Sequence, residues 1–317
     1  MPLHCIAQDI HFSNWKESAI ISAPANTGNF DGNLKIMGNF RNQWRSVTTP
    51  YKTAGISAEA KDFIGSLPRL QMGLGFSRDI TGDSRWVTTQ AQCIVAYEIG
   101  LGVNFSITPL IGTGLIQQQY SNENLQYDQQ WNGTYFDPSL QSGESFTQFN
   151  NNYYQFTHGL SAGIKNDETA TLLGYSMQLN TSNENAAGYG IQRSARTTII
   201  AVHRRKADEF VIEPSIHFQF QKSYRNILPG IKLYKSIETG NWHNVVAHAG
   251  VSIRISDAII PTIGMQYDQW TGGISYDVNL SKLKVASNGR GSWEIYIGTV
   301  LKKIPRVIPT PYCRPIY

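Results

Sequence analysis

Seven histidines and three cysteines are the side chains in this chain best suited to catalysis or metal binding. Their spacing forms no HExxH pair, no CxxC pair and no other arrangement typical of a metal site. There is no GxSxG nucleophile turn. Gly73-x-Gly75 and Gly112-x-Gly114 lie inside strand-like segments and do not precede helices, so they are not phosphate-binding loops. The sequence therefore predicts no catalytic residue, no metal ligand and no bound cofactor.

Glu213 and His217 come nearest to an acid–base pair. Both lie on the polar side of an alternating segment, Glu209–Phe220, and so face the same way along a strand. They could line a pore, belong to a polar network inside a barrel, or act in catalysis. No nucleophile can be assigned to a histidine here, so we favour the network over a surface enzyme such as a lipase barrel.

The segments that must position these side chains alternate with a period of two. From Asn244 to Ile255, an unbroken series of apolar side chains at every second position alternates with a mostly polar series that includes His248, Ser252 and Arg254. A strand points successive side chains to opposite faces, so one face here is apolar and the other is mostly hydrated. A tilted strand needs about 9–11 residues to cross a bilayer. The pattern predicts an all-β protein, an antiparallel transmembrane β-barrel.

Composition agrees with a barrel whose lipid-facing side chains are only half of each strand. Charged residues make up 16% of the 317 residues, against about 25% in soluble domains. No run of 18 apolar residues is present, so ordinary helical spans are not expected. The alternative is a large soluble β-sandwich, or two. The net charge of +4 is not gathered into a basic stripe, so nucleic acid is not an expected partner.

The strand-like segments predict about fourteen strands, because single-chain barrels favour even numbers. We expect one barrel domain over residues 8–317. The expected strands are Asn33–Arg41, Lys52–Lys61, Arg69–Ile80, Trp86–Ile99, Gly102–Leu115, Tyr153–Lys165, Thr169–Asn180, Arg193–Arg204, Glu209–Gln221, Asn226–Ser236, Asn244–Ile255, Ala258–Asp268, Trp270–Leu280 and Ser292–Leu301.

Two segments lack the alternation. The region before Asn33 has a poor strand signal, and it could plug the lumen. The second segment, residues 116–152, is rich in Gln, Asn, Ser and Tyr, and we expect it to form a long polar loop. A loop of this length is uncommon unless it is functional or disordered. Its mixture of polar and aromatic residues is typical of protein contact, and a solvated loop without a partner is the alternative.

The first seven residues, 1–7, are expected to be the remnant of a secretory signal peptide. Cys5-Ile6-Ala7 is similar to the small residues that end such a signal, although no full apolar stretch precedes it. Cys5 as a lipoprotein cysteine is the other reading, which His4 fits poorly. Cys93 alternates with apolar neighbours and is expected on the lipid face, so a bridge to Cys313 is not expected.

Several short motifs, in order along the chain, resemble the PorP/SprF family. They begin with Gln8–Ser13 (QDIHFS), Ala23–Gly28 (APANTG) and Phe40–Trp44 (FRNQW). They continue with Gly73–Phe76, Asn180–Asn183, Gly273–Leu283 (GISYDVNLSKL) and Gly291–Ile295 (GSWEI). Each motif alone is weak, and together they span nearly the whole chain. The segment Ser22–Ala25 lacks the Asn of the usual family turn, and Arg314 separates Cys313 from Pro315.

The resemblance implies a bacterial outer-membrane protein of Bacteroidetes linked to type IX secretion. It implies a non-enzymatic barrel that assists secretion or surface anchoring of cargo such as gliding adhesins, through the cargo's C-terminal domain. The partners are then that cargo, other secretion components and outer-membrane lipid. A closed barrel has no free strand edge, so we expect docking through loops with aromatic anchors: Tyr127, Trp131, Tyr135 and Phe136. A passive or ligand-selective porin is the alternative function.

Overall fold

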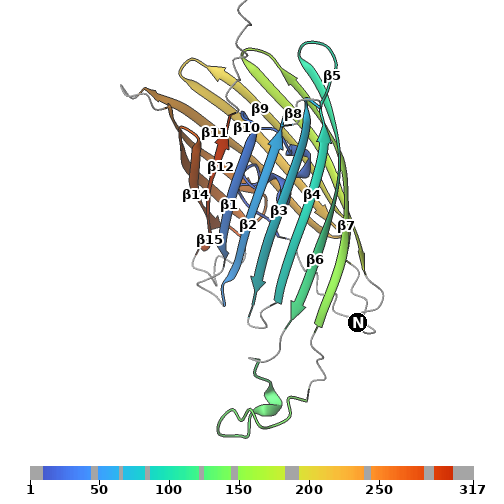
Figure 1. Ribbon diagram of the computed structural model, residues 1–317. Helices are drawn as coiled ribbons and strands as arrows, with labels where there is room; N and C mark the ends of the chain where they lie inside the picture. The colour runs from blue at the N-terminus through green and yellow to red at the C-terminus, as the bar shows by residue number, and fades with distance from the viewer. Residues whose placement is uncertain are drawn as a thin grey trace, which may run out of the picture.

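The chain forms one closed β-barrel (Figure 1). The computed structural model describes residues 10–43, 49–63, 67–82, 86–120, 125–143, 149–182, 193–238, 244–281 and 289–302. Fifteen strands share one antiparallel sheet, and the two-residue β5 (Ile99–Gly100) pairs only with β6, so fourteen strands form the wall. The wall closes through pairing of β4 with β6 and of β1 with β15.

The wall strands fall close to the segments expected from the sequence. They are β1 (Leu34–Gln43), β2 (Tyr51–Lys61), β3 (Leu70–Thr81), β4 (Trp86–Tyr97), β6 (Phe105–Tyr120), β7 (Phe149–Lys165), β8 (Thr169–Ser182), β9 (Arg196–Ala207), β10 (Phe210–Gln221), β11 (Tyr224–Glu238), β12 (Asn244–Arg254), β13 (Ala258–Tyr267), β14 (Trp270–Asn279) and β15 (Arg290–Leu301).

The long polar loop is shorter than predicted. Residues 116–120 extend β6 and residues 149–152 begin β7, with Gln117 paired to Asn152. The sequence signal disappears there because both faces of these strand ends carry polar side chains. The backbone ladder nevertheless continues, because its hydrogen bonds do not depend on side-chain polarity. The connecting loop is therefore residues 121–148.

The expected alternation of faces is confirmed. In β4, Thr88, Gln90 and Gln92 are buried toward the lumen while Ala91 is exposed on the outer face. Cys93 lies on the same outer side and is a free thiol. Large aliphatic side chains stand on the outer surface of the other strands too, such as Ile263, which is 62% exposed. The outer face is therefore apolar and the inner face polar, as a bilayer requires.

The N-terminal segment lies inside the barrel, where Figure 1 shows it in dark blue. It contains a short helix, α1 (Ala19–Ser22), and a single 3₁₀ turn, η1 (Pro24–Asn26), all of whose residues are buried. We call residues 10–32 the plug. Among the described residues, no helix is long and apolar enough to cross a membrane.

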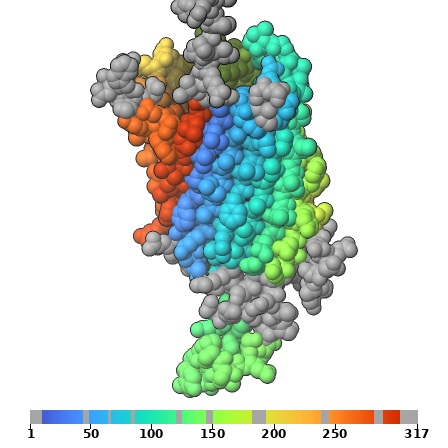
Figure 2. Space-filling view, viewed as in Figure 1, coloured from blue at the N-terminus to red at the C-terminus, as the bar shows by residue number. Residues whose placement is uncertain are grey.

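The two rims of the barrel differ. β1 begins opposite the end of β15, where Leu34 pairs with Leu301, and this rim has tight turns at residues 166–168, 208–209 and 268–269. We call it the short-turn rim. The opposite rim carries the connections 121–148, 183–195 and 280–289 together with shorter ones. We call it the long-loop rim; the described part of its longest loop projects far from the wall (Figures 1 and 2).

The apolar outer face predicts the response to a buried charge. Ile263 lies in the middle of the outward row of β13, so Ile263→Arg should lower the free energy of unfolding in lipid by about 2–4 kcal/mol. Gln266→Arg, on the exposed short-turn end of the same strand, is the control and should change little. Urea titration in lipid vesicles measures both. Equal effects would contradict the assignment of the lipid face.

Candidate functional site: the plugged lumen and the long loop

The plug is attached to the wall at its first residues by hydrogen bonds to a buried carboxylate. The backbone N–H groups of Ser13 and Asn14 donate to Glu294 of β15 at 2.8 and 2.9 Å. The side-chain amide of Asn14 donates to Ser275 Oγ of β14 at 2.8 Å. Glu294 is fully buried, so these N–H groups replace the water that its charge would otherwise need.

Two guanidinium groups complete this attachment around Asp277 of β14. Arg41 of β1 and Arg254 of β12 each lie 2.8 Å from Asp277 Oδ2. Ser13 Oγ of the plug accepts from both arginines and donates to Asp277 Oδ1 at 3.1 Å. A buried charge is tolerated when it is paired and hydrogen-bonded. We call Ser13, Asn14, Arg41, Arg254, Asp277 and Glu294 the plug lock.

A second charged contact holds the middle of the plug. Lys16 pairs with Glu213 of β10, and Glu17 pairs with Lys232 of β11 at 2.9 Å. Burial opposes ionisation of Glu17, but Lys232 and Lys16 outweigh it and lower the pKa of Glu17 to about 2. Burial also lowers the pKa of Lys16, against the opposing effect of Glu213. Glu17 therefore stays charged at neutral pH.

The apolar side of the plug fits against glycines of the wall. A Cβ added at Gly75 of β3 would lie 2.6 Å from Ile20, and one at Gly55 of β2 would lie 2.8 Å from Ile21. Such distances are too short for carbon atoms, so any larger residue would push the plug away. The Gly73-x-Gly75 pair, interpreted from sequence as a feature of the barrel, thus also provides room for Ile20.

Wall side chains also bind the plug backbone. Arg196 of β9 donates to the carbonyl of Ile21 at 2.7 Å, and His217 of β10 lies 3.2 Å from the carbonyl oxygen of Ser22. The ring of His217 stacks on Trp15 at 5.3 Å. The sequence hypothesis of a polar lumen network is confirmed for Glu213 and His217, but each one binds the plug and they do not pair with each other.

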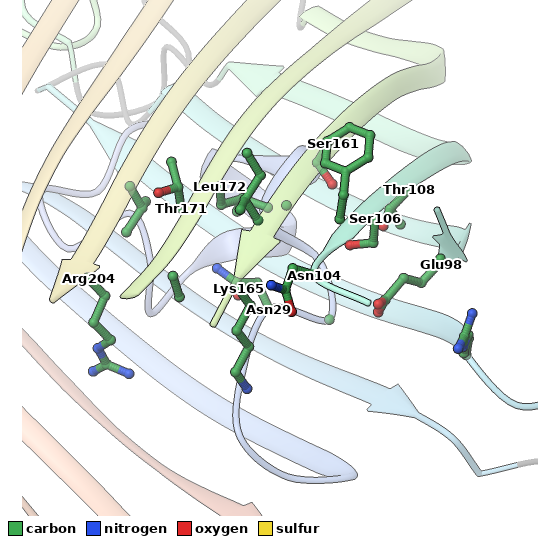
Figure 3. A pocket seen from close by; sticks show the side chains of 18 of the residues that line it. Asn29, Glu98, Asn104, Ser106, Thr108, Ser161, Lys165, Thr171, Leu172 and Arg204 are labelled. Atoms are coloured by element: carbon green, nitrogen blue, oxygen red, sulfur yellow. The ribbon is translucent and has the colours of Figure 1, made fainter. Parts of the chain in front are cut away.

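A cavity of about 690 Å³ lies between the plug and the short-turn rim and is lined by residues of that rim. Figure 3 shows Glu98, Asn104, Lys165 and Arg204 around it, with Leu172 on one wall. Plug residues 27–31 line the side of the cavity opposite the rim. In the part of the chain that the structure describes, no group of His, Cys, Asp and Glu side chains could hold a metal ion.

The described part of the long loop, residues 125–143, has a fixed conformation of its own. The turn η2 (Asp128–Gln130) leads into an isolated bridge between Trp131 and Phe136. Asn132 Oδ1 accepts the N–H groups of Thr134 and Tyr135, both at 3.0 Å, and Gly133 has a φ of +95°. These bonds join residues within the tip itself.

The four aromatic residues predicted to bind a partner all lie in this unit. Trp131 is 58% exposed and Tyr135 is 60% exposed. Phe136 and Tyr127 are half-buried; Phe136 pairs with Trp131 across the bridge, and the N–H of Tyr127 donates to Gln130 Oε1 at 3.2 Å. The loop therefore exposes the side chains of Trp131 and Tyr135 to solvent, while those of Tyr127 and Phe136 are half-buried within it.

A protein-family model matches most of the chain. The family model described as "Type IX secretion system membrane protein PorP/SprF" matches residues 5–299. The chain belongs to the PorP/SprF family. No curated protein is significantly similar to it in sequence. Membership and the closed barrel make it an outer-membrane protein associated with type IX secretion, and the family is not of an enzymatic kind.

Solved structures with a similar chain path are also outer-membrane barrels. CdiB from Escherichia coli has 12% identity and a TM-score of 0.48, covering 83% of this chain and 62% of that one. The CymD monoaromatic hydrocarbon channel has 9% identity and a TM-score of 0.48, covering 90% and 93%. A Pseudomonas aeruginosa FadL homologue has 10% identity and a TM-score of 0.49, covering 89% and 93%. The PorP/SprF chain thus spans 62% of the CdiB chain, and nothing about its function follows from these barrels.

Sequence reasoning missed the plug lock, although its parts lie in the motifs of the family resemblance. Ser13 belongs to the first motif, Arg41 to FRNQW, Asp277 to SYDVN and Glu294 to GSWEI. The signal that could have indicated the plug lock was the presence of charged residues at inward positions of β1, β14 and β15. Charges that face a lumen need oppositely charged partners. The spacing of the motifs could not show that these positions meet.

The plug lock predicts a large cost for removing its central charge. Asp277→Asn would leave two buried guanidinium groups without their carboxylate, so the free energy of unfolding should fall by about 3–5 kcal/mol. Glu209→Gln removes an exposed carboxylate that pairs with Lys235, and it should change little. Chemical unfolding in detergent measures both. A small effect of Asp277→Asn would contradict the lock.

The middle contact predicts rescue by a charge exchange. Glu17→Lys places a third cation beside Lys16 and Lys232, so the plug should become accessible to protease in the folded barrel. Adding Lys232→Glu restores an opposite pair and should restore protection. Limited proteolysis followed by mass spectrometry reads the cleavage. If the double variant is cut as fast as the single one, the contact does not hold the plug.

The pKa of Glu17 predicts how acid acts on the plug. The free glutamate has a pKa of about 4.3, and in the plug it is about 2. Its stabilising contribution is therefore complete above pH 4.3 and is lost as the pH falls toward 2. Proteolytic accessibility measured after exposure to acid should separate wild type from Glu17→Gln at pH 6, and the difference should disappear near pH 2. A constant difference would refute this role.

Proposed function

We propose that this protein is a non-enzymatic outer-membrane platform that assists type IX secretion or holds secreted cargo at the cell surface. The observation that carries the proposal is the ordered loop tip with Trp131 and Tyr135 exposed beyond one rim. Aromatic side chains in a fixed conformation are typical anchors of protein interfaces. The partner is the C-terminal domain of a cargo such as a gliding adhesin of Bacteroidetes, or another secretion component.

The rest of the barrel leaves few other places for a protein partner. The sheet is closed, so no strand edge is free to extend into a partner strand. The lumen holds the plug, whose charges are paired with the wall. Tyr127 and Phe136 then serve to hold the loop tip, and Trp131 and Tyr135 make the contact.

The long-loop rim is assigned to the cell exterior in this proposal. Outer-membrane barrels have short turns on the periplasmic side and longer loops outside. The tight turns 166–168, 208–209 and 268–269 lie at the rim where β1 begins and β15 ends. Residues 1–7, which fall outside the described residues, are proposed to be what remains of a secretory signal.

The proposal is tested with Trp131→Ala/Tyr135→Ala expressed in place of the native chain. Each lost anchor weakens a protein interface by about 2 kcal/mol or more, so surface-retained cargo should fall by at least roughly tenfold. Phe63→Ala removes an exposed aromatic residue from the short-turn rim and is the control. Proteomics of shaved cell surfaces measures the cargo. An unchanged surface in cells with equal barrel levels would overturn the proposal.

A porin and a plugged platform predict different single-channel conductances for the isolated barrel. A plug that contacts strands on several sides of the lumen should keep single-channel conductance in planar bilayers small and unsteady. A large and steady conductance of the intact chain would support a porin and would contradict a platform with a plugged lumen.

A further inference from the structure

Lys52 of β2 and Arg78 of β3 form an isolated cationic pair on the outer face of the barrel. Both are exposed, and inward-facing Thr53 and Asp79 lie beside them in sequence, where Thr53 Oγ1 donates to Asp79. Arg78 is paired in register with Ala54, and Lys52 with Ile80. The two cations are thus diagonal neighbours on the membrane side of adjacent strands. The outer surface of β2 and β3 is on the near side of Figure 2.

The strand register shows at what depth in the membrane the pair lies. One outward row runs Phe76, Ala91, Leu115 and Tyr154 across β3, β4, β6 and β7. The next outward row toward the long-loop rim runs Arg78, Thr89, Gln117 and Asn152. The first row is apolar or aromatic and the second is polar. Rows of partners tilt with the strands, and on its other side the row of Arg78 continues through Ala54 and Phe40 into the apolar surface. Arg78 therefore lies where the polar and apolar parts of one row meet, which puts the two cations at the edge of the hydrocarbon, at the level of lipid headgroups.

The pair has no protein counterion in the part of the chain that the structure describes. Among the described residues, neither Lys52 nor Arg78 takes part in an ion pair. Lys235 on the short-turn rim differs in this respect, since it lies 2.8 Å from Glu209. The small side chain of Ala54 separates Arg78 from the Phe40 ring, which packs on Trp293 at 5.3 Å. An anion could therefore approach both cations over Ala54 with an aromatic wall beside it.

The geometry points to a binding site for the phosphate of a lipid headgroup, formed by Lys52 and Arg78. Phosphate is the anion found at this depth in a membrane, and Arg and Lys are its usual ligands. The assignment of the long-loop rim to the exterior, which rests on the proposed function, makes the ligand a phosphorylated lipid A of the outer leaflet. No covalent step is involved.

The test measures lipid binding by the full chain in detergent, using native mass spectrometry with added bisphosphorylated lipid A. Each cation contributes about fivefold to affinity for an anionic headgroup, so Lys52→Gln/Arg78→Gln should weaken binding on the order of 25-fold. Arg205→Gln/Lys235→Gln removes the same charge from the short-turn rim and should leave binding unchanged. Lys52→Arg/Arg78→Lys keeps both charges and should bind as wild type does.

Different lipids separate the possible sources of the phosphate. Dephosphorylated lipid A should bind wild type as weakly as lipid A binds the Gln double variant. Equal binding of lipid A by wild type and that variant would overturn the site. Binding of phosphatidylglycerol as tight as that of lipid A would overturn the outer-leaflet assignment. Trp131→Ala/Tyr135→Ala should keep full lipid affinity, so failure of cargo docking and failure of this site give different results.

Discussion

The need to satisfy every backbone polar group inside a bilayer governs this structure. Hydrocarbon offers no hydrogen-bond partners, so a sheet that crosses it must close on itself. Closure is completed where β4 pairs with β6 and β1 with β15. It commits each strand to one apolar and one polar face, and the polar faces together enclose a lumen. That lumen gathers charges that must be balanced from inside, and residues 10–32 provide the balancing groups and cover the glycine-lined side of the wall.

Parts of the chain that are far apart in sequence meet at the plug lock. Ser13 and Asn14 from one end bind Glu294 from the other, 281 and 280 residues away, while Asp277 joins the guanidinium groups of two further strands. Buried charges are stable only when all their partners are present. The charged groups of the wall therefore need the plug, and the plug needs the wall. The proposed function therefore places the action at the surface, where the described tip of the loop, residues 125–143, exposes Trp131 and Tyr135.

The sequence predicted the wall well, because strand alternation is a local signal. The segment Asn244–Ile255 shows it, with His248 and Arg254 inward as expected. Local signals failed at the ends of β6 and β7, where Gln117 and Asn152 are polar neighbours in a continuing ladder. The location of the N-terminal segment in the lumen was a hypothesis based on its lack of strand alternation. Its contacts could not be derived from sequence because they join residues that are far apart along the chain. The exposure of Trp131 and the partial burial of Phe136 were not distinguished from sequence, because both are aromatic residues of one polar segment.

Location of the plug within the lumen is the claim on which the account depends, and a disulfide tests it directly. A Cβ at Gly174 of β8 would lie 2.8 Å from the Cβ of Ala25 in the plug, which is closer than the mean disulfide separation, so the bond requires the plug to shift outward by about 1 Å. Ala25→Cys/Gly174→Cys should form this bond in outer membranes isolated from cells, and peptide mapping after mild oxidation should find the two peptides joined. If both thiols remain free while the barrel is folded, the N-terminal segment does not occupy the lumen and the account is wrong.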